Sequence, residues 1–461
     1  MPWSRGPLRA LVGATFVAAC VPAFADNLET ALIQAYQNNP QINAQRALVR
    51  STDESVPQAL SGYRPRISAT ANVGQQYTDQ TTKSGGTYTT VAGFTASRTF
   101  GATATQTLYN GLQTANRTRQ AESQVLAARE TLRVIEQQVL LDAATAYMNL
   151  LQNTAILDLQ KRNVEVLQEQ LRQTRDRFNV GEVTRTDVAQ AESRVAAGQS
   201  QLLAAQANVT TARAAYRRVI GVEPGRLSPG APVDRFSPRT LDLAVAQGQA
   251  ENPSVQAAMH GIDVAELQVK ISEGQLYPTL AVTASVTKSY ETTPTQPESL
   301  QASVLGQLTI PLYQGGSEFS AIRQNKETVG QRRIELALNR DQARANVVQS
   351  WGLLEAAKAQ IQATQAQVAA AEIALNGVRE EARVGQRTTL DVLNAQQELV
   401  NARVAMVTAQ RDRVVASYTL LQSVGRLAIP VLGLQVPLYD PMVHYQQIRD
   451  SWYGVRNPDG R

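Results

Sequence analysis

The chain has 461 residues, a length that favours two or three ordinary domains. Only 5% of the residues are aromatic and the mean hydropathy is −0.25, values that are low for a chain with large globular cores. The 44 Lys and Arg exceed the 39 Asp and Glu by a net charge of +5, which is too small an excess to indicate nucleic-acid binding. Beyond the N-terminus no apolar run reaches the ~18 residues of a transmembrane helix, which disfavours an α-helical membrane protein.

Residues 1–25 have the pattern of a secretory signal peptide. Arg5 and Arg9 precede an apolar stretch that ends in a small-x-small cleavage pattern at Ala25. Cleavage there removes the only cysteine, Cys20, so the exported chain would contain no disulfide. Two alternatives stay open: the segment is retained as a membrane anchor, or a lipid is attached to Cys20, which follows a sequence resembling a lipoprotein box.

The most informative feature of the sequence is a duplication. The pattern Val-Gly-x-x-Thr-x-x-Asp-Val begins at Val180 and again at Val384, an offset of 204 residues. Leu-Tyr-x-Gly recurs at the same offset, and an Asn-Pro pair recurs at an offset of 213. The difference between the two offsets arises in a polar stretch rich in Gly, Ser, Thr and Pro. A surface loop of this composition tolerates a change in length. The sequence therefore predicts two copies of one structural unit and a tail, at residues 26–235, 236–425 and 426–461.

Each copy is predicted to contain a helix, two strands and two further helices. The long helical segments lack proline and are rich in Ala, Gln, Glu, Arg and Leu, which lose little rotamer freedom in a helix. At ~1.5 Å per residue, the longest would span on the order of 100 Å. The predicted helix, strand pair, long helix and shorter helix lie at about 27–61, 63–109, 112–179 and 185–220, and again at about 239–275, 277–313, 316–383 and 388–424.

The long helices carry a narrow apolar seam. Leu150, Leu157, Val164 and Leu171 recur every seven residues, a spacing that indicates coiled-coil packing. The remaining surface is polar, as expected for helices that form the wall of a water-filled tube. An antiparallel coiled coil without a pore explains this pattern equally well.

The predicted strands favour the tube. Residues 67–73 and 280–286 alternate between apolar or small and polar side chains, and Val304, Gly306, Leu308, Ile310 and Leu312 are expected to share one face. Strands of roughly ten residues with one apolar face can cross an outer membrane when tilted. Four strands cannot close a barrel, and an open sheet edge is not tolerated in lipid. Three chains would supply about twelve strands, enough to enclose a lumen.

The ordered set of motifs resembles the TolC-like outer-membrane efflux proteins over essentially the whole mature chain. The resemblance implies a homotrimer with a 12-stranded transmembrane β-barrel, four strands per chain, and an α-helical tunnel that extends into the periplasm. It implies a passive exit duct that works with a periplasmic adaptor (membrane fusion protein) and an inner-membrane RND or ABC pump. Residues 222–240 and the tail from about 426 would form a band around the middle of the tunnel.

The repeated aspartates have two compatible interpretations. Each follows a Thr by three residues, which predicts a helix-capping box after a Gly that ends the preceding helix. In the resembled family this turn is the periplasmic entrance, and carboxylates narrow the pore there. By that resemblance Asp391 would line the constriction, and Arg387 would reach Thr186 and Asp187 of a neighbouring helix pair. Asn394 stands where the family has a second constriction acid and Ala382 where an aromatic is common, so we expect a less acidic and looser gate.

The resemblance also assigns the two helical turns to adaptor docking. A simpler interpretation is that their glycines only provide a positive φ angle. The residues concerned are Val180, Gly181, Glu182 and Thr184 in the first turn, and Val384, Gly385, Gln386 and Thr388 in the second.

The sequence does not favour an enzyme. It contains two histidines, His260 and His444, and neither belongs to a recognisable metal pair or catalytic triad. No phosphate loop or dinucleotide fingerprint is present, so no cofactor is expected. The competing function is that of a periplasmic structural or adaptor rod, which would share the helical hairpins and lack the β-hairpins.

Overall fold

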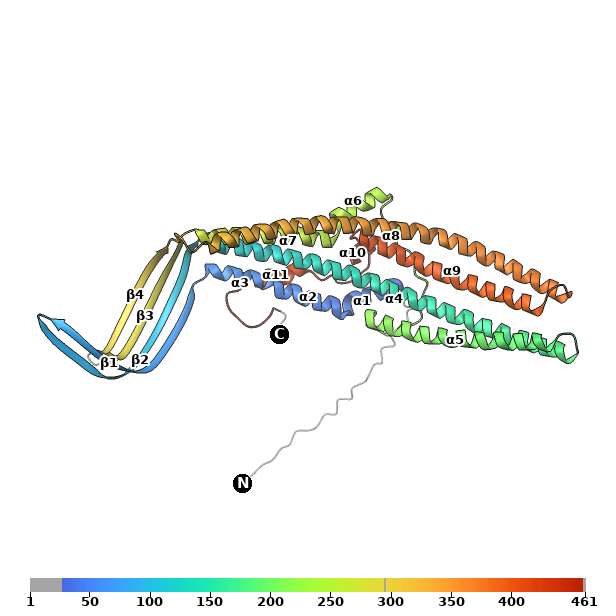
Figure 1. The fold of residues 1–461 in the computed structure, drawn as a ribbon, viewed down its shortest axis with the longest axis horizontal. Coiled ribbons are helices and arrows are strands. Elements are labelled where there is room, and N and C mark those ends of the chain that lie inside the picture. Colours follow the sequence, from blue (N-terminus) through green and yellow to red (C-terminus); the bar gives the residue numbers. More distant parts are fainter. Residues whose placement is uncertain (1–26, 294–295, 459–461) are drawn as a thin grey trace, which may run out of the picture.

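The computed structural model describes residues 27–293 and 296–458. The predicted signal peptide, with Cys20 and the cleavage site, lies outside the described residues. The molecule is elongated, with a β-sheet at one end and helices that run along the long axis to the other end (Figure 1). Among the described residues, no helix is both apolar enough and long enough to cross a membrane.

The helices and strands follow the predicted duplicated order. The first copy contains α1 (Leu28–Asn38), α2 (Pro40–Asp53), α3 (Ser55–Leu60), β1 (Arg66–Ser84), β2 (Thr87–Asn110), α4 (Gln113–Asn179) and α5 (Arg185–Ile220). The second contains α6 (Leu241–Glu251), α7 (Pro253–Glu273), β3 (Thr279–Thr293), β4 (Gln296–Thr309), α8 (Ser317–Arg383) and α9 (Thr389–Ser423). The tail adds α10 (Ile429–Leu432) and α11 (Pro441–Ile448).

Helices α4 and α8 have 67 residues each, and both run the length of the helical part (Figure 1). At ~1.5 Å per residue each is about 100 Å long, as the absence of proline predicted. The seam is buried at Leu150 and Val164 and becomes exposed at Phe178, near the tip. The helices are therefore held by a narrow stripe of contacts, and much of their surface is polar and open.

The predicted single helix at 27–61 was wrong, because this segment forms three helices. The first break is at Asn39, whose extended ψ of 124° reflects the steric restriction on a residue before proline. The second is at Glu54, three residues before Pro57, whose ring would clash with a carbonyl of an uninterrupted helix. The segment at 239–275 breaks in the same way at Asn252, before Pro253.

The duplicated Asn-Pro pair joins two helices end to end. Asn39 Nδ2 donates a hydrogen bond to the carbonyl of Val219, in the last turn of α5, at 2.8 Å. Asn252 Nδ2 donates equivalently to the carbonyl of Ser423, at the end of α9, at 3.1 Å. Carbonyls at a helix C-terminus have no partner within the helix. Each Asn supplies one, so α2 and α3 continue the line of α5 beside α4 (Figure 1).

The four strands form one antiparallel sheet in the order β1-β2-β3-β4, with β1 and β4 at its edges. The register places apolar and small side chains on one face, which we call the apolar face. It comprises Ile67, Ala69, Ala71 and Val73 of β1, Phe100, Ala102 and Ala104 of β2, Leu280, Val282, Ala284 and Val286 of β3, and Leu300, Ala302, Val304 and Leu308 of β4.

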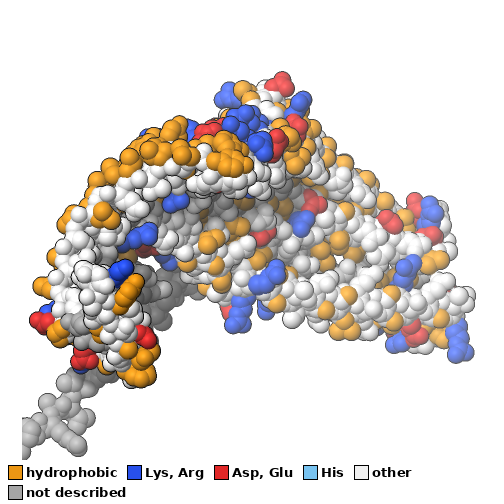
Figure 2. Space-filling view, turned by 60° about the vertical axis from the view of Figure 1, so that its left-hand side comes forward, with side chains coloured by type: hydrophobic (Ala, Val, Ile, Leu, Met, Phe, Trp, Pro, Cys, Tyr) orange, Lys and Arg blue, Asp and Glu red, His pale blue; other side chains and the backbone are white. Residues whose placement is uncertain are grey.

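The apolar face is exposed, and hydrophobic side chains are gathered along the convex side of the curved sheet (Figure 2). The opposite face is polar: Ser285 and Ser303 hydroxyls lie 2.9 Å apart across β3 and β4. This confirms the predicted alternation, except that β4 ends at Thr309, so Ile310 and Leu312 follow the strand.

The main core lies at the middle of the long axis. It joins α1, α4, α5 and α9 to the connecting segment at Val233 and to the start of the tail at Leu427 and Ile429. Val233, Leu427 and Ile429 therefore lie where the middle band was predicted, and a band around an assembled tunnel stays a prediction. The rest of the tail leaves the band: α11 packs against α2, towards the sheet (Figure 1).

Candidate functional site

The two predicted helical turns lie at the end of the molecule farthest from the sheet (Figure 1). Gly181 and Gly385 have φ angles of +81° and +80°, the left-handed conformation that glycine adopts without strain. A Cβ added to either would meet no atom within 4 Å. The glycines are therefore needed for the backbone turn, and packing within the chain leaves both turns open to a partner.

Both aspartates act as helix caps. Asp187 Oδ2 accepts hydrogen bonds from the backbone N and Oγ1 of Thr184, at 2.9 and 2.7 Å. Asp391 Oδ2 accepts the same pair from Thr388, at 3.0 and 2.9 Å. These bonds lower the pKa of each carboxyl from its usual value, so both are ionised at neutral pH. Their stabilising effect is present above the usual carboxyl pKa and is lost as the pH falls through the lowered one.

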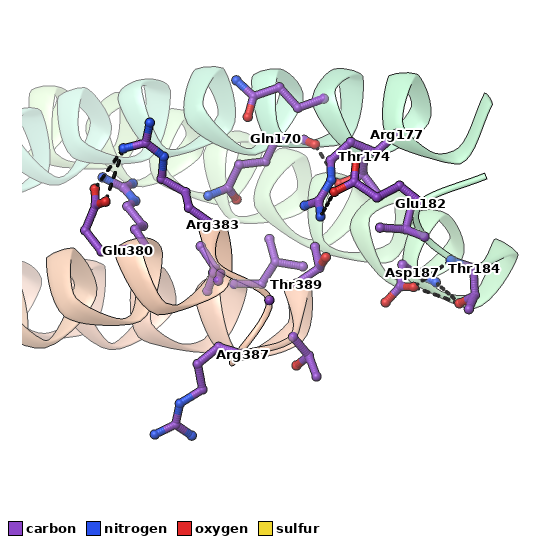
Figure 3. Close-up of a pocket in the computed structure, with 18 residues that line it drawn as sticks. Gln170, Thr174, Arg177, Glu182, Thr184, Asp187, Glu380, Arg383, Arg387 and Thr389 are labelled. Carbon is purple, nitrogen blue, oxygen red and sulfur yellow. Dashed lines mark hydrogen bonds and ion pairs between the residues drawn. The ribbon is translucent and has the colours of Figure 1, made fainter. Parts of the chain in front are cut away.

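The two tips enclose a cavity of about 840 Å³ (Figure 3). Of the predicted site residues, it is lined by Glu182, Thr184 and Asp187 from the first hairpin and by Gly385, Arg387 and Thr388 from the second. The other predicted residues are not among its lining: Val180, Gly181, Thr186, Val384, Gln386, Asp391 and Asn394.

The charged side chains at the tips pair mainly within their own hairpin. Arg177 donates to Glu182 at 2.7 Å and thereby lowers the pKa of that carboxyl. Arg387 donates to Glu381 at 2.8 Å and points away from the first hairpin (Figure 3). Within one chain Arg387 therefore does not reach Thr186 or Asp187. The predicted contact with a neighbouring helix pair stays a prediction about two subunits.

Close to the tips, a polar contact links the two hairpins directly. Arg194 Nη2 on α5 donates to Asn394 Oδ1 on α9 at 2.7 Å. Beside it, Val195 and Leu393 are buried in a small apolar cluster with Leu167. Asn394, which was predicted to stand in place of a constriction acid, is thus a neutral side chain that accepts a hydrogen bond from the guanidinium of Arg194.

The sequence reasoning missed several residues of this site. The cavity is also lined by Arg177, Arg379 and Arg383, and Arg194 binds Asn394, the neighbour in sequence of the lining residue Leu393. A local signal existed for Arg177 and Arg383, because cations are favoured in the last turn of a helix. No local signal exists for Arg194, because its partner Asn394, itself a predicted site residue, is 200 residues away.

Each histidine lies beside a single aspartate and outside the cavity between the tips. His260 Nδ1 is 3.6 Å from Asp263 Oδ2 on the same helix, and His444 Nδ1 is 3.0 Å from Asp53 Oδ2. In the described part of the chain, no cluster of three or more His, Cys, Asp or Glu side chains could hold a metal ion.

The fold matches those of solved outer-membrane channels. The chain superposes on the Campylobacter jejuni CmeC outer membrane channel with a TM-score of 0.77, covering 92% of this chain and 89% of that one, at 14% sequence identity. The chain therefore has the fold of these channels. The predicted fold class is confirmed: a mainly helical chain with a four-stranded sheet, the build of trimeric channels that join a helical tunnel to a β-barrel.

Sequence comparison identifies the family. The profile described as "Outer membrane efflux protein" matches residues 31–222 and 244–426. The chain is 42% identical over 440 residues to the outer membrane efflux protein BepC of Brucella suis biovar 1, covering 95% of this chain and 94% of BepC. It is 26% identical to the alkaline protease secretion protein AprF of Pseudomonas aeruginosa, covering 88% and 86%.

The chain belongs to the outer membrane efflux protein family. Its location is the outer membrane, and its role is that of an exit duct rather than an enzyme. The resemblance to TolC-like proteins stated from the motifs is thereby confirmed.

Proposed function

We propose that three copies of the chain form the outer-membrane exit duct of a tripartite efflux or type I secretion system. A periplasmic adaptor would connect the duct to an inner-membrane RND or ABC pump, and cargo would pass passively as small molecules, proteins or both. The names of the relatives BepC and AprF, an efflux protein and a secretion protein, support this range.

The sheet is the observation that carries the proposal. Its apolar face is exposed, yet β1 and β4 leave two edges with unpaired backbone groups. Such edges cannot remain unpaired in lipid. Pairing β4 of one chain with β1 of the next satisfies both edges and encloses the polar face as a lumen. A soluble rod has no use for this arrangement.

The gate is proposed at the tips. Three copies of Asp391 around a common axis would form a ring of ionised carboxylates that attracts cations. Asn394 and Arg194 support a less acidic constriction than a ring with two acids per chain. Arg387, Thr186 and Asp187 would hold neighbouring helix pairs together in the closed state.

Conductance in planar bilayers tests the duct and its gate. Asp391→Asn is expected to lower the cation-to-anion permeability ratio by roughly twofold or more, because it removes the ring charge. Arg387→Ala is expected to raise the conductance of the closed state, because it removes the proposed link between helix pairs. Asp176→Asn, which neutralises an exposed acid on α4, is the charge-matched control and should change neither quantity.

Two outcomes contradict these proposals. Wild-type conductance and selectivity in both variants would remove the gate assignment. Purified protein that gives no ion current and behaves as a soluble monomer would remove the duct itself.

The open helical turns support adaptor docking. Gly181→Tyr and Gly385→Tyr are expected to leave trimers intact, because a Cβ there meets no atom of the chain and the left-handed strain costs only ~1–2 kcal/mol. They are expected to abolish export, because the ring would block a docked partner. Gly85→Tyr is the matched control: Gly85 also has a positive φ (+57°) and open space, and it lies at the opposite end, between β1 and β2. Export by all three variants, or loss of trimers in the tip variants alone, would contradict docking.

A further inference from the structure

The end of the chain is fixed along the outside of the helices, close to the sheet. The backbone N of Tyr439 donates to the hydroxyl of Tyr36 on α1 at 3.1 Å. Tyr445 of α11 then packs against Val56 and Val125, on α3 and α4. The tail therefore follows a defined path from the middle of the molecule towards the sheet.

A buried carboxylate makes this path specific. Asp53 on α2 is wholly buried, with His444 of the tail at 3.0 Å and Arg129 of α4 at 3.7 Å. Burial raises the pKa of Asp53, while the hydrogen bond from His444 and the charge of Arg129 act in the opposite direction. A buried charge without its partners is strongly destabilising, so the tail supplies a contact that α2 needs.

The path ends at the base of the sheet. The guanidinium of Arg64 lies 4.6 Å from the ring centroid of Trp452, and its Nη1 donates to the carbonyl of Ser451. Arg64 stands two residues before β1 begins at Arg66. Even so, Trp452 is 67% exposed and Tyr453 is 93% exposed. Trp452 is thus held beside the first strand with most of its side chain uncovered, and Tyr453 follows it almost fully exposed.

Other exposed aromatics stand at the same level. Tyr63 and Tyr277 precede β1 and β3, and Tyr109 and Tyr313 lie at or beyond the ends of β2 and β4. Trp and Tyr favour the boundary between membrane and water, because their rings are apolar while the indole N–H and phenol O–H bind water or headgroups. The base of the sheet, where the tail ends, therefore has the composition of a membrane interface.

We propose that Trp452 and Tyr453, with the exposed Val455, insert into the periplasmic leaflet of the outer membrane. The tail is then a second membrane contact, outside the barrel, and its ligand is the headgroup and upper acyl region of phospholipids. Arg456 is exposed beside these side chains and can pair with a lipid phosphate. The proposal rests on the proposed function, since it requires the apolar face to lie in the same membrane.

Tryptophan fluorescence tests the proposal directly. The sequence contains only Trp3, Trp351 and Trp452, and cleavage of the signal peptide removes the first. In a Trp351→Phe variant, Trp452 is the single reporter. The protein is reconstituted into phosphatidylcholine vesicles with or without bromine on the upper acyl chain. We expect a roughly twofold or larger loss of emission in the brominated vesicles, because interfacial apolar groups reach ~5–10 Å into the headgroup boundary.

Two further variants control the experiment. Trp452→Phe leaves Trp351, which lies on α8 against the small core around Leu354, and its emission should not respond to bromine. If Trp351→Phe does not fold, the difference between wild type and Trp452→Phe gives the same information. Phe100→Trp, in a background without the other two, places a reporter on the apolar face and should be quenched.

The outcomes separate the two proposals. Quenching of the Phe100→Trp reporter without quenching of Trp452 overturns the tail contact and leaves the barrel. Quenching of Trp452 by acrylamide, which stays in water, then shows where the tail lies. Strong quenching means that the tail is in water, and weak quenching means that a neighbouring subunit covers it. If neither reporter is quenched, the membrane-embedded barrel fails, and the tail contact fails with it.

Discussion

Gly111→Ala is expected to prevent the two halves of the chain from joining at the base of the sheet, with loss of nearly all trimer. Gly111 has a φ of +64°, and a Cβ there would lie 2.2 Å from the carbonyl oxygen of Gly274 and 2.9 Å from Cβ of Tyr277. Left-handed strain costs ~1–2 kcal/mol. Overpacking adds ~1–3 kcal/mol where the obstacle is backbone that cannot move aside.

Two other glycines provide graded controls. Gly181→Ala imposes the same left-handed strain in open space, so it should cost only about 1–2 kcal/mol and leave trimers in place. Gly315, the second-copy equivalent of Gly111, has a φ of +75° and meets nothing within 4 Å in its own chain. The internal duplication places it beside residue 61 of the next subunit, so Gly315→Ala should spare the fold of the chain and weaken assembly.

The measurement is the amount of trimer extracted from outer membranes, on gels run with and without heating. Equal trimer yields for Gly111→Ala and Gly181→Ala would show that the close approach of Gly111 and Gly274 does not matter. The interpretation of the Leu-Tyr-x-Gly motif as the join between the copies would then be wrong.

Paired cysteines on β1 and β4 are expected to give a covalent trimer. Within the chain the copies are joined by β2 and β3, where Ala104 pairs with Ala284. In the second copy, Ala104 corresponds to Leu308 at the offset of 204, and in the first copy Ala284 corresponds to Ala71 at the offset of 213. The equivalent pair between subunits is therefore Leu308 of one chain and Ala71 of the next. Both side chains belong to the apolar face, so the derived register is consistent with a continuous barrel.

The test uses Ala71→Cys with Leu308→Cys, and the adjacent pair Asn72→Cys with Gln307→Cys. Neighbouring positions alternate between hydrogen-bonded and non-hydrogen-bonded pairs, so one of the two has the shorter separation that a disulfide needs. The predicted cleavage after Ala25 removes Cys20, the only cysteine of the sequence, so no other thiol would compete. Mild oxidation should convert most of the protein into a species three chains in size on heated, non-reducing gels.

A shifted pair controls for chance collisions. Val73→Cys with Leu308→Cys places the sulfurs at a diagonal position ~7–8 Å apart, beyond the reach of a disulfide. Efficient cross-linking of the shifted pair alone would mean a different register. A ladder that continues past three chains would mean an open assembly, and monomer alone would support the rod.

Much of the fold is predictable because its signals are local. Helix α4 was expected at about 112–179 and is found at Gln113–Asn179, since one proline-free stretch and one glycine turn set its ends. The capping boxes at Thr184 and Thr388 were also expected, because three residues suffice to form each of them. The alternation of the strands belongs to the same class of short-range pattern.

The missed features depend on contacts between distant residues. The contact of Arg194 with Asn394 and the path of the tail past Asp53 have no local signal. The break at Glu54 is different, because Pro57 was a local signal that the prediction passed over. His444 and Asp53 are 391 residues apart, and nothing near either one identifies the other.

The sequence by itself determined the duplication, the kinds of helices and strands, the approximate lengths of the long helices, and the family. The strands, at 14 to 24 residues, are longer than the ten or so expected. Only the tertiary structure decided which side chains meet: the cavity between the tips, the end-to-end helix joints, the close approach of Gly111 and Gly274, and the position of Trp452 at the base of the sheet. The physical reason is range. Backbone preferences and capping act over a few residues, whereas close packing and the satisfaction of buried polar groups select partners from the whole chain.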